Sequence, residues 1–293
     1  MLPPAWWGVA DPVAVPAERS VAALIGDRTL DAELAGLLWL LVEAGTPIVV
    51  AGPRASGRTT LLTALLPMLP PGARPLLLAG EAEDFAAIPE AVELGWRRER
   101  ASRSPVVGVA NASTVLLAAE LGDRPPLGIR GERALIVLRA LSVGYGLGAT
   151  IEAASLEEAF TALRGPAVGA GADELAGIGV VLVLGERPPG VAPVVEVAHY
   201  VRPISRDPHG HVQRLPPAVL AACDAVSGRL EHYSWGVAAE LADRTGRRAI
   251  ELEREQVRRS GLLGRLAAAG VRDPGDVRDA IDGYRDEFRR RDE

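Results

Sequence analysis

Hydrophobic and polar positions alternate with helical spacing in the region after residue 30. Between Leu34 and Val42 apolar residues recur every three or four positions. Asp31, a preferred N-cap residue, stands before this stretch, and Gly45 stands where helices commonly end in a glycine. The pattern predicts a helix that starts at Asp31, and a second helix from Thr59 to about residue 66.

Continuous apolar runs mark the expected strands. Each is four or five residues long and rich in Val, Leu and Ile, as is typical of strands buried on both faces, and they lie at 48–51, 76–79 and 180–184. Helical patterns separate them along the chain. This order predicts an α/β fold with a largely parallel sheet.

From about residue 226 the pattern changes to charged, periodic helix. One helix is predicted over 251–269, ending at Gly270, and a last helix follows Asp273 as its N-cap, with Pro274 in the first turn. Facing apolar stripes predict that the two pack as a hairpin; they consist of Leu262, Leu263, Leu266, Val277, Ile281 and Tyr284. We therefore expect an extended N-terminal arm (1–30), a core (31–225) and a helical subdomain (226–293).

Composition narrows the classes of function. The 293 residues include 32 basic and 38 acidic side chains, a net charge of −6 that disfavours nucleic acid as a partner. No lysine occurs in the chain, so every basic side chain is arginine. The single cysteine, Cys223, cannot form an intramolecular disulfide, which favours a cytoplasmic location. No apolar run is long enough to predict insertion into a membrane.

One motif carries chemistry. Residues 52–59, Gly-Pro-Arg-Ala-Ser-Gly-Arg-Thr, have the spacing of a phosphate-binding loop between a strand and a helix, with Arg58 in place of the usual lysine. Backbone N–H groups of such a loop bind phosphate, and Thr59 is the expected Mg²⁺ ligand if ATP binds. The predicted nucleotide-binding residues are Gly52, Pro53, Arg54, Ala55, Ser56, Gly57, Arg58, Thr59 and Thr60. A glycine-rich turn without a ligand is the alternative.

Several stretches in the same order resemble the motor ATPases of type II and type IV secretion, type IV pili and archaella, in particular the archaeal branch. They include 34–43, the loop, 68–74, Gly131-Glu132-Arg133-Ala134, 138–146, 149–159 and Gly270-Val271-Arg272-Asp273. The resemblance covers about residues 30 to 290. It implies a RecA-like P-loop NTPase core with a C-terminal helical hairpin, an ATP/Mg cofactor, and assembly beneath a membrane platform protein.

The chain departs from that family at the positions that the resemblance assigns to catalysis. The acidic pair after the second strand falls on Ala79 and Gly80, with Glu81 and Glu83 as displaced candidates to replace it. The Walker B glutamate falls on Gly128, in a segment with two prolines, and the histidine of the family is Glu152. Loss of a carboxylate that positions water lowers the rate by about 10²–10⁴.

These departures favour a degenerate secretion ATPase, a pseudo-ATPase with weak or absent hydrolysis that acts with an active motor. Slow ATP turnover and a structural adaptor that binds no nucleotide are the alternatives. The expected partner is an intact paralogue or the platform protein, contacted through the arginines between Arg97 and Arg103 and through the helix after Ser155. We expect a cytoplasmic protein that reaches the membrane only through such a partner.

Overall fold

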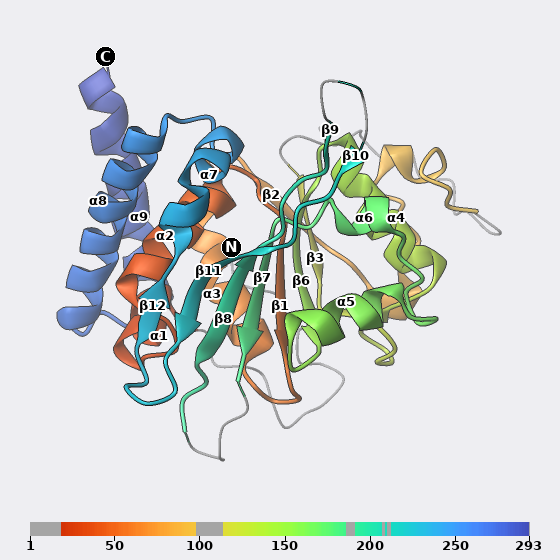
Figure 1. Cartoon of the computed structure of the whole chain (residues 1–293), viewed down its shortest axis with the longest axis horizontal. Coiled ribbons are helices and arrows are strands. Elements are labelled where there is room, and N and C mark those ends of the chain that lie inside the picture. The colour runs from red at the N-terminus through yellow and green to blue at the C-terminus, as the bar shows by residue number, and fades with distance from the viewer. Residues whose placement is uncertain (1–18, 98–113, 186–190, 207–208, 210–211, 293) are drawn as a thin grey trace.

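The computed structural model describes residues 19–97, 114–185, 191–206, 209 and 212–292. Helices cover both faces of a central sheet, which gives three layers (Figure 1). The mixed α/β class predicted from the sequence is confirmed.

The central sheet has eight strands among the described residues, in the order β12-β11-β8-β7-β1-β6-β3-β2. Five of them run parallel: β1 (Ile48–Gly52), β2 (Arg74–Leu77), β3 (Thr114–Ala118), β6 (Gly146–Glu152) and β7 (Val180–Leu184). Antiparallel strands extend one end of the sheet: β8 (Val195–Tyr200), β11 (Ala218–Cys223) and β12 (Leu230–His232). Two-residue strands form two small pairs: β4 (Glu120–Leu121) with β5 (Gly128–Ile129), and β9 (Ser205–Arg206) with β10 (Val212–Gln213).

One face of the sheet packs against the N-terminal and C-terminal helices, which lie together on one side of Figure 1. They are α1 (Val21–Gly26), α2 (Ala32–Glu43), α3 (Arg58–Leu65), α7 (Ala238–Arg244), α8 (Ala249–Ala268) and α9 (Pro274–Asp292). The other face packs against α4 (Glu132–Ala140), α5 (Leu156–Arg164) and α6 (Ala172–Leu175). Single 3₁₀ turns are η2 (Leu66–Met68), η3 (Gly80–Ala82), η4 (Pro89–Ala91), η6 (Leu141–Val143) and η7 (Ser234–Val237).

The helix predicted after Asp31 is confirmed. The Asp31 carboxylate accepts the N–H of Leu34 at 2.8 Å, and Gly45 follows α2 with φ of +71°. Nine consecutive residues of α2, Leu34–Val42, are buried, because α1 and α8 cover the side that faces away from the sheet. Strands β1 and β7 coincide with two of the predicted runs, whereas β2 begins two residues before the predicted 76–79.

The N-terminal prediction needs correction. Residues 21–26 form helix α1, with the Ser20 hydroxyl accepting the Ala23 N–H at 3.1 Å, so this part of the chain is not an extended arm. Four of the six α1 residues are buried, which explains why an apolar stretch without visible periodicity folds as a helix. Residues 1–18 lie outside the described residues. Strand β12 lies beyond residue 226, where only helix was expected; the domain boundaries stay predictions.

The C-terminal helices attach to α2 through a buried cluster of charged and aromatic side chains. The Arg259 guanidinium lies 4.7 Å from the centre of the Trp39 ring and 2.5 Å from the Glu43 carboxylate. Arg285 of α9 pairs with the same carboxylate at 2.9 Å, and Tyr284 packs edge-on against Trp39. The apolar residues predicted to face one another on these two helices all belong to the core shared with α2 and β1.

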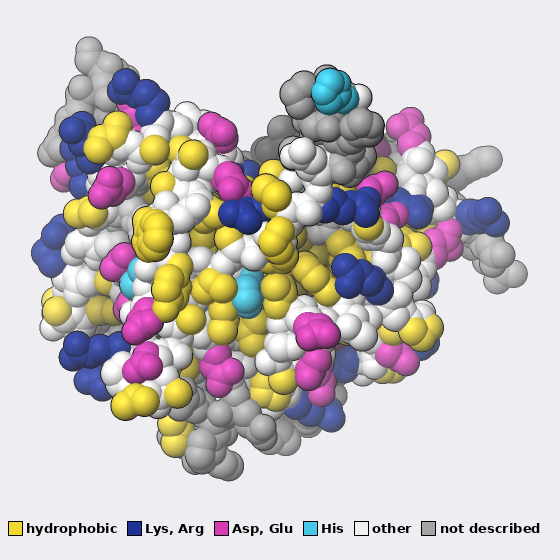
Figure 2. Space-filling view, in the orientation of Figure 1, with side chains coloured by type: hydrophobic (Ala, Val, Ile, Leu, Met, Phe, Trp, Pro, Cys, Tyr) yellow, Lys and Arg dark blue, Asp and Glu magenta, His cyan; other side chains and the backbone are white. Residues whose placement is uncertain are grey.

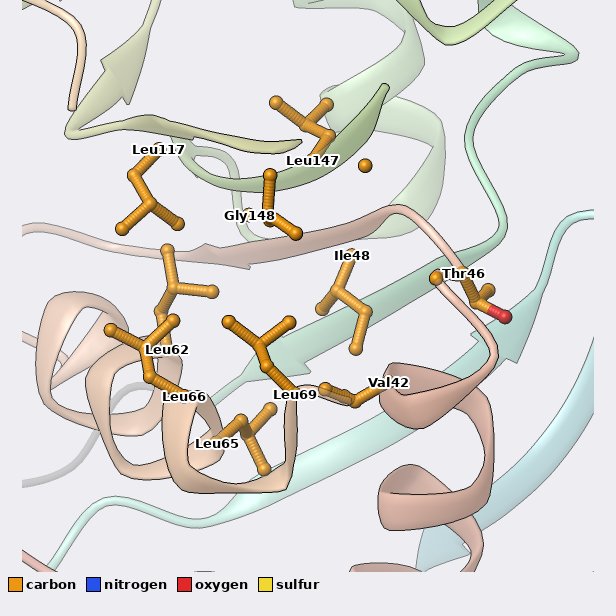
Figure 3. A pocket seen from close by; sticks show the side chains of 13 residues that line it. Val42, Thr46, Ile48, Leu62, Leu65, Leu66, Leu69, Leu117, Leu147 and Gly148 are labelled. Carbon is orange, nitrogen blue, oxygen red and sulfur yellow. The ribbon is translucent and has the colours of Figure 1, made fainter. Parts of the chain in front are cut away.

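A small apolar cavity lies between the sheet and the helices α2 and α3 (Figure 3). Its volume is about 30 Å³, and Val42, Ile48, Leu65 and Leu117 are among the side chains that line it. Its lining is almost wholly apolar, and Thr46 is the polar side chain among the labelled residues.

Apolar side chains are also exposed over the antiparallel end of the sheet. Figure 2 shows them gathered around β8 and β11, with charged side chains at the periphery. Trp235 is 78% exposed beside this face, and Val219 and Tyr233 line the same shallow hollow. None of the helices in the described part of the chain combines the length and hydropathy of a membrane span.

Candidate functional site

The glycine-rich loop joins β1 to α3 as the motif predicted. Gly57 is the N-cap of α3 with φ of +86°, and Ala55 also has a positive φ of 63°. A Cβ atom at Gly52 would collide with the Ser56 hydroxyl, so this position has no room for a side chain. The N-cap has no side chain to satisfy the first N–H groups of α3, and such groups are available to an anion.

The Arg58 side chain does not extend into solvent. It is only 5% exposed and makes two contacts with the Glu120 carboxylate, Nη1 to Oε1 at 3.3 Å and Nη2 to Oε2 at 3.2 Å. The Glu120 side chain is 4% exposed. The guanidinium that replaces the expected lysine is thus paired with a buried carboxylate beside the loop.

Glu120 has further donors on the neighbouring strand β6. The Glu152 N–H donates to its Oε1 at 2.7 Å, and the Thr150 hydroxyl, which is closer to the Ala119 carbonyl oxygen at 2.5 Å, lies 3.2 Å from its Oε2. Burial raises the pKa of the Glu120 carboxyl, while Arg58 and these hydrogen bonds act in the opposite direction. Burial likewise lowers the pKa of Arg58. The net shift of the pKa is upward for Glu120 and downward for Arg58, so the pairing offsets the cost of removing the two charges from water only in part.

Glu152 lies beside the loop. It is the register partner of Gly52 across β1 and β6, and its Oε2 is 4.0 Å from Arg58 Nη2. Its side chain is 55% exposed, so it extends toward solvent. The structure thus brings together the loop, Arg58 and Glu152, all of which the sequence analysis singled out.

The displaced acids Glu81 and Glu83 have other contacts. Glu81 pairs with Arg130 at 3.1 Å. Glu83 accepts the N–H groups of Ala79 and Phe85, both at 2.7 Å, and so shapes the turn after β2. That turn follows the edge strand of the sheet, and β6 and β3 separate β2 from β1. Among the described interactions, neither acid contacts residues 52–60.

The prediction for Gly128 needs correction. We expected the carboxylate of the apolar strand to be missing, because the resemblance assigned the glutamate position to Gly128. The apolar strand is β3, and Glu120 comes two residues after its end. Gly128 lies on β5 as the register partner of Glu120, and a Cβ there would be 2.5 Å from the Gly122 carbonyl oxygen. The two prolines belong to the turn between β4 and β5.

A signal for Glu120 is present in the sequence. Residues 115–119 are Val-Leu-Leu-Ala-Ala, a continuous apolar run with an acid directly after it. The sequence analysis instead assigned this position to Gly128, on the resemblance to the secretion motors. Of the arginines from 97 to 103, only Arg97 lies within the described residues, and its backbone N–H donates to Glu132 at 3.3 Å.

No His, Cys, Asp or Glu cluster able to hold a metal ion occurs within the described residues. Thr59 remains the candidate ligand for Mg²⁺ brought by a nucleotide. It lies in the first turn of α3, directly after Arg58.

No family model matches the chain. The uncharacterized protein MJ0900 of Methanocaldococcus jannaschii is 32% identical over 154 residues, which are 50% of this chain and 26% of that protein. The uncharacterized protein MJ1287 of the same organism is 32% identical over 144 residues, 46% of this chain and 50% of that protein. The chain thus spans half or less of the length of these curated relatives.

Among solved structures, the VirB11 ATPase from the Brucella suis type IV secretion system, in complex with sulphate, is similar at 21% identity. The similarity covers 56% of this chain and 50% of that one, with a TM-score of 0.38. This overlap and the partial coverage of the relatives are both too low to show the family of the chain.

Proposed function

We propose that residues 52–60 bind the phosphate groups of a nucleotide, and that the chain is a secretion-ATPase-like protein with a RecA-like core. The observation that carries the proposal is the Arg58–Glu120 pair beside an uncapped helix N-terminus. The first N–H groups of α3 have no side-chain cap, and the guanidinium that follows the loop is the cation nearest to them in sequence.

The position of the loop in the sheet supports this proposal. It follows the carboxyl end of β1, which lies between β6 and β7, and all three strands are parallel. Ligands of open α/β sheets bind at the carboxyl ends of parallel strands. The sequence resemblance to the secretion motors points to the same loop and to ATP with Mg²⁺ as the ligand.

Hydrolysis is expected to be weak or absent. Arg58 is engaged by Glu120, and Glu152 adds a second carboxylate close to Arg58, so we expect it to oppose a phosphate bound at the loop. A like-charge contact near 4 Å costs about 4 kcal/mol at an effective dielectric of about 20. We therefore place the chain as a pseudo-ATPase that associates with an intact paralogue or with a membrane platform protein.

A second candidate is slow ATP turnover, and Glu120 favours it specifically. This buried carboxylate lies beside the loop, where the sequence analysis expected none. A carboxylate in such a position can orient a water molecule for attack.

Phosphate release by the purified chain separates the two candidates. The pseudo-ATPase proposal expects no more release than from a Thr59→Ala, Arg58→Ala double variant. Turnover that both this double variant and Glu120→Gln abolish would establish the second candidate. Glu83→Gln is the matched control, because it removes another buried carboxylate, whose side chain accepts the N–H groups of its own turn.

Binding is tested by calorimetry with ATP and Mg²⁺. We expect a Kd near or above about 1 mM, equivalent to about −4 kcal/mol, because the loop amides remain while Arg58 is already paired. Absence of any binding at 10 times that concentration, roughly 10 mM, would favour the adaptor alternative. For the partner, co-purification with a family ATPase followed by light scattering is decisive, and a stable homohexamer of this chain alone would refute the proposal.

A further inference from the structure

Arg58 has two competing anionic partners once a phosphate occupies the loop. We propose that Glu120 withholds Arg58 from the bound phosphate, and that Arg124 pairs with Glu120 when Arg58 turns to the ligand. This inference rests on the proposed phosphate site and specifies how that site is regulated. Glu120 acts here as a positioning residue for Arg58.

The contacts of Glu120 make such an exchange feasible. Without Arg58, the carboxylate keeps the hydrogen bond from the Glu152 N–H at 2.7 Å, and the Thr150 hydroxyl remains 3.2 Å from its other oxygen. Arg124 is four residues further along the chain, and its Nη1 already lies 3.9 Å from Glu120 Oε2. The Arg124 side chain is 44% exposed, so it has freedom to close this distance. The buried Glu120 carboxylate therefore still has a positively charged partner after Arg58 turns to the ligand.

The exchange also defines the class of ligand. Arg58 faces the Glu120 carboxylate and, at 4.0 Å, the Glu152 carboxylate. A singly charged anion offers the guanidinium no gain over these contacts. A pyrophosphate or nucleoside polyphosphate carries several charges and binds arginine by paired hydrogen bonds. We therefore expect selectivity for polyphosphates over monoanions such as acetate or nitrate.

The primary test is the affinity for inorganic pyrophosphate, measured by calorimetry at one ionic strength. Glu120→Gln is expected to bind at least about tenfold more tightly than the wild type, the factor that one charge-assisted hydrogen bond contributes. Glu255→Gln is the matched control. It removes another buried carboxylate paired with arginine, on α8 and far from the loop in sequence, and is expected to leave the affinity unchanged.

The gain must depend on Arg58. In an Arg58→Ala background Glu120→Gln is expected to produce no increase, because the released cation is missing. A gain that persists without Arg58 would show a general change of charge and would overturn the proposal. If Glu120→Gln does not give the near-ultraviolet dichroism of the folded chain, Glu120→Asp replaces it. The shorter side chain of that variant keeps the negative charge but moves it away from Arg58, so it is also expected to bind pyrophosphate more tightly than the wild type.

Arg124 supplies an independent test. Arg124→Ala is expected to weaken pyrophosphate binding about two- to fivefold, the range of an exposed ion pair, because Glu120 then has no replacement partner. In the Glu120→Gln background, Arg124→Ala is expected to leave the affinity for pyrophosphate unchanged. Arg265→Ala on α8 is the control for the loss of one positive charge. Equal effects of Arg124→Ala in both backgrounds would overturn its role.

The outcomes distinguish this inference from the function on which it rests. If the wild type binds pyrophosphate and Glu120→Gln binds it equally well or more weakly, the competition is refuted but the phosphate site is retained. Binding by neither protein refutes both.

Discussion

Gly36 permits the close crossing of α2 and α8, and its replacement by alanine tests the packing of the C-terminal helices. A Cβ atom at this position would be 2.8 Å from the Ser260 backbone nitrogen and 3.0 Å from the Gln256 carbonyl oxygen, and would also collide with the Ser260 hydroxyl. Two of these three atoms are backbone, so the contact is relieved only if the helices move apart.

The magnitude follows from two opposed effects. Alanine is favoured over glycine in a helix interior by about 1 kcal/mol. Overpacking of a close contact costs about 1–3 kcal/mol, and rigid backbone atoms place this site at the upper end. We therefore expect Gly36→Ala to lower the free energy of unfolding by about 2 kcal/mol. This corresponds to a decrease in Tm of about 3 °C for 293 residues, at an unfolding entropy of about 2.1 cal/mol/K per residue.

The matched control is Gly283→Ala on α9, where an added Cβ meets no atom within 4 Å. Only the helix propensity changes there, so the unfolding free energy is expected to rise by about 0.5–1 kcal/mol. Urea unfolding followed by far-ultraviolet dichroism measures both variants on one scale. A Gly36→Ala variant as stable as the wild type, or more stable, would refute the close crossing of α2 and α8.

Two further predictions concern buried charges. Burial of the His232 ring lowers its pKa, but the hydrogen bond to Asp31 at 2.8 Å and nearby carboxylates outweigh this effect, and the net shift is upward. The resulting stability is complete below the ordinary histidine pKa of about 6.5 and is lost as pH rises through the higher folded pKa. Wild-type unfolding free energy should thus fall from pH 6 to pH 8 more than that of His232→Asn, and parallel profiles would contradict this. Arg259→Met should lower the unfolding free energy by about 2–3 kcal/mol, because it removes a buried partner of Glu43. Arg258→Ala, half-exposed, should lower it by less than about 1 kcal/mol, and equal losses would contradict the assigned burial.

Local patterns were sufficient to predict several elements. Asp31 and the apolar spacing after it identified α2, and the continuous runs identified β1 and β7. These signals depend on residues a few positions apart, which a sequence displays directly. The loop after β1 was predicted for the same reason.

The partners of the candidate site could not be predicted in this way. Arg58 and Glu120 are separated by 62 residues, and only the order of β1, β6 and β3 in the sheet brings them together. The resemblance to a family also placed the expected carboxylate position at Gly128, although a continuous apolar run directly precedes Glu120. The contact between Asp31 and His232 spans 201 residues, so no local sequence pattern predicts it.

The packing of α2 beneath α8 has a consequence for synthesis of the chain. Glu43 ends α2 and Ala249 begins α8, so the covering helix begins 206 positions later in the chain. At 5–20 residues per second, the ribosome needs roughly 10–40 s to deliver the covering helix after α2 has emerged. Throughout this interval the side of α2 that α8 covers stays exposed, which makes the nascent chain a substrate for chaperones that bind exposed apolar segments.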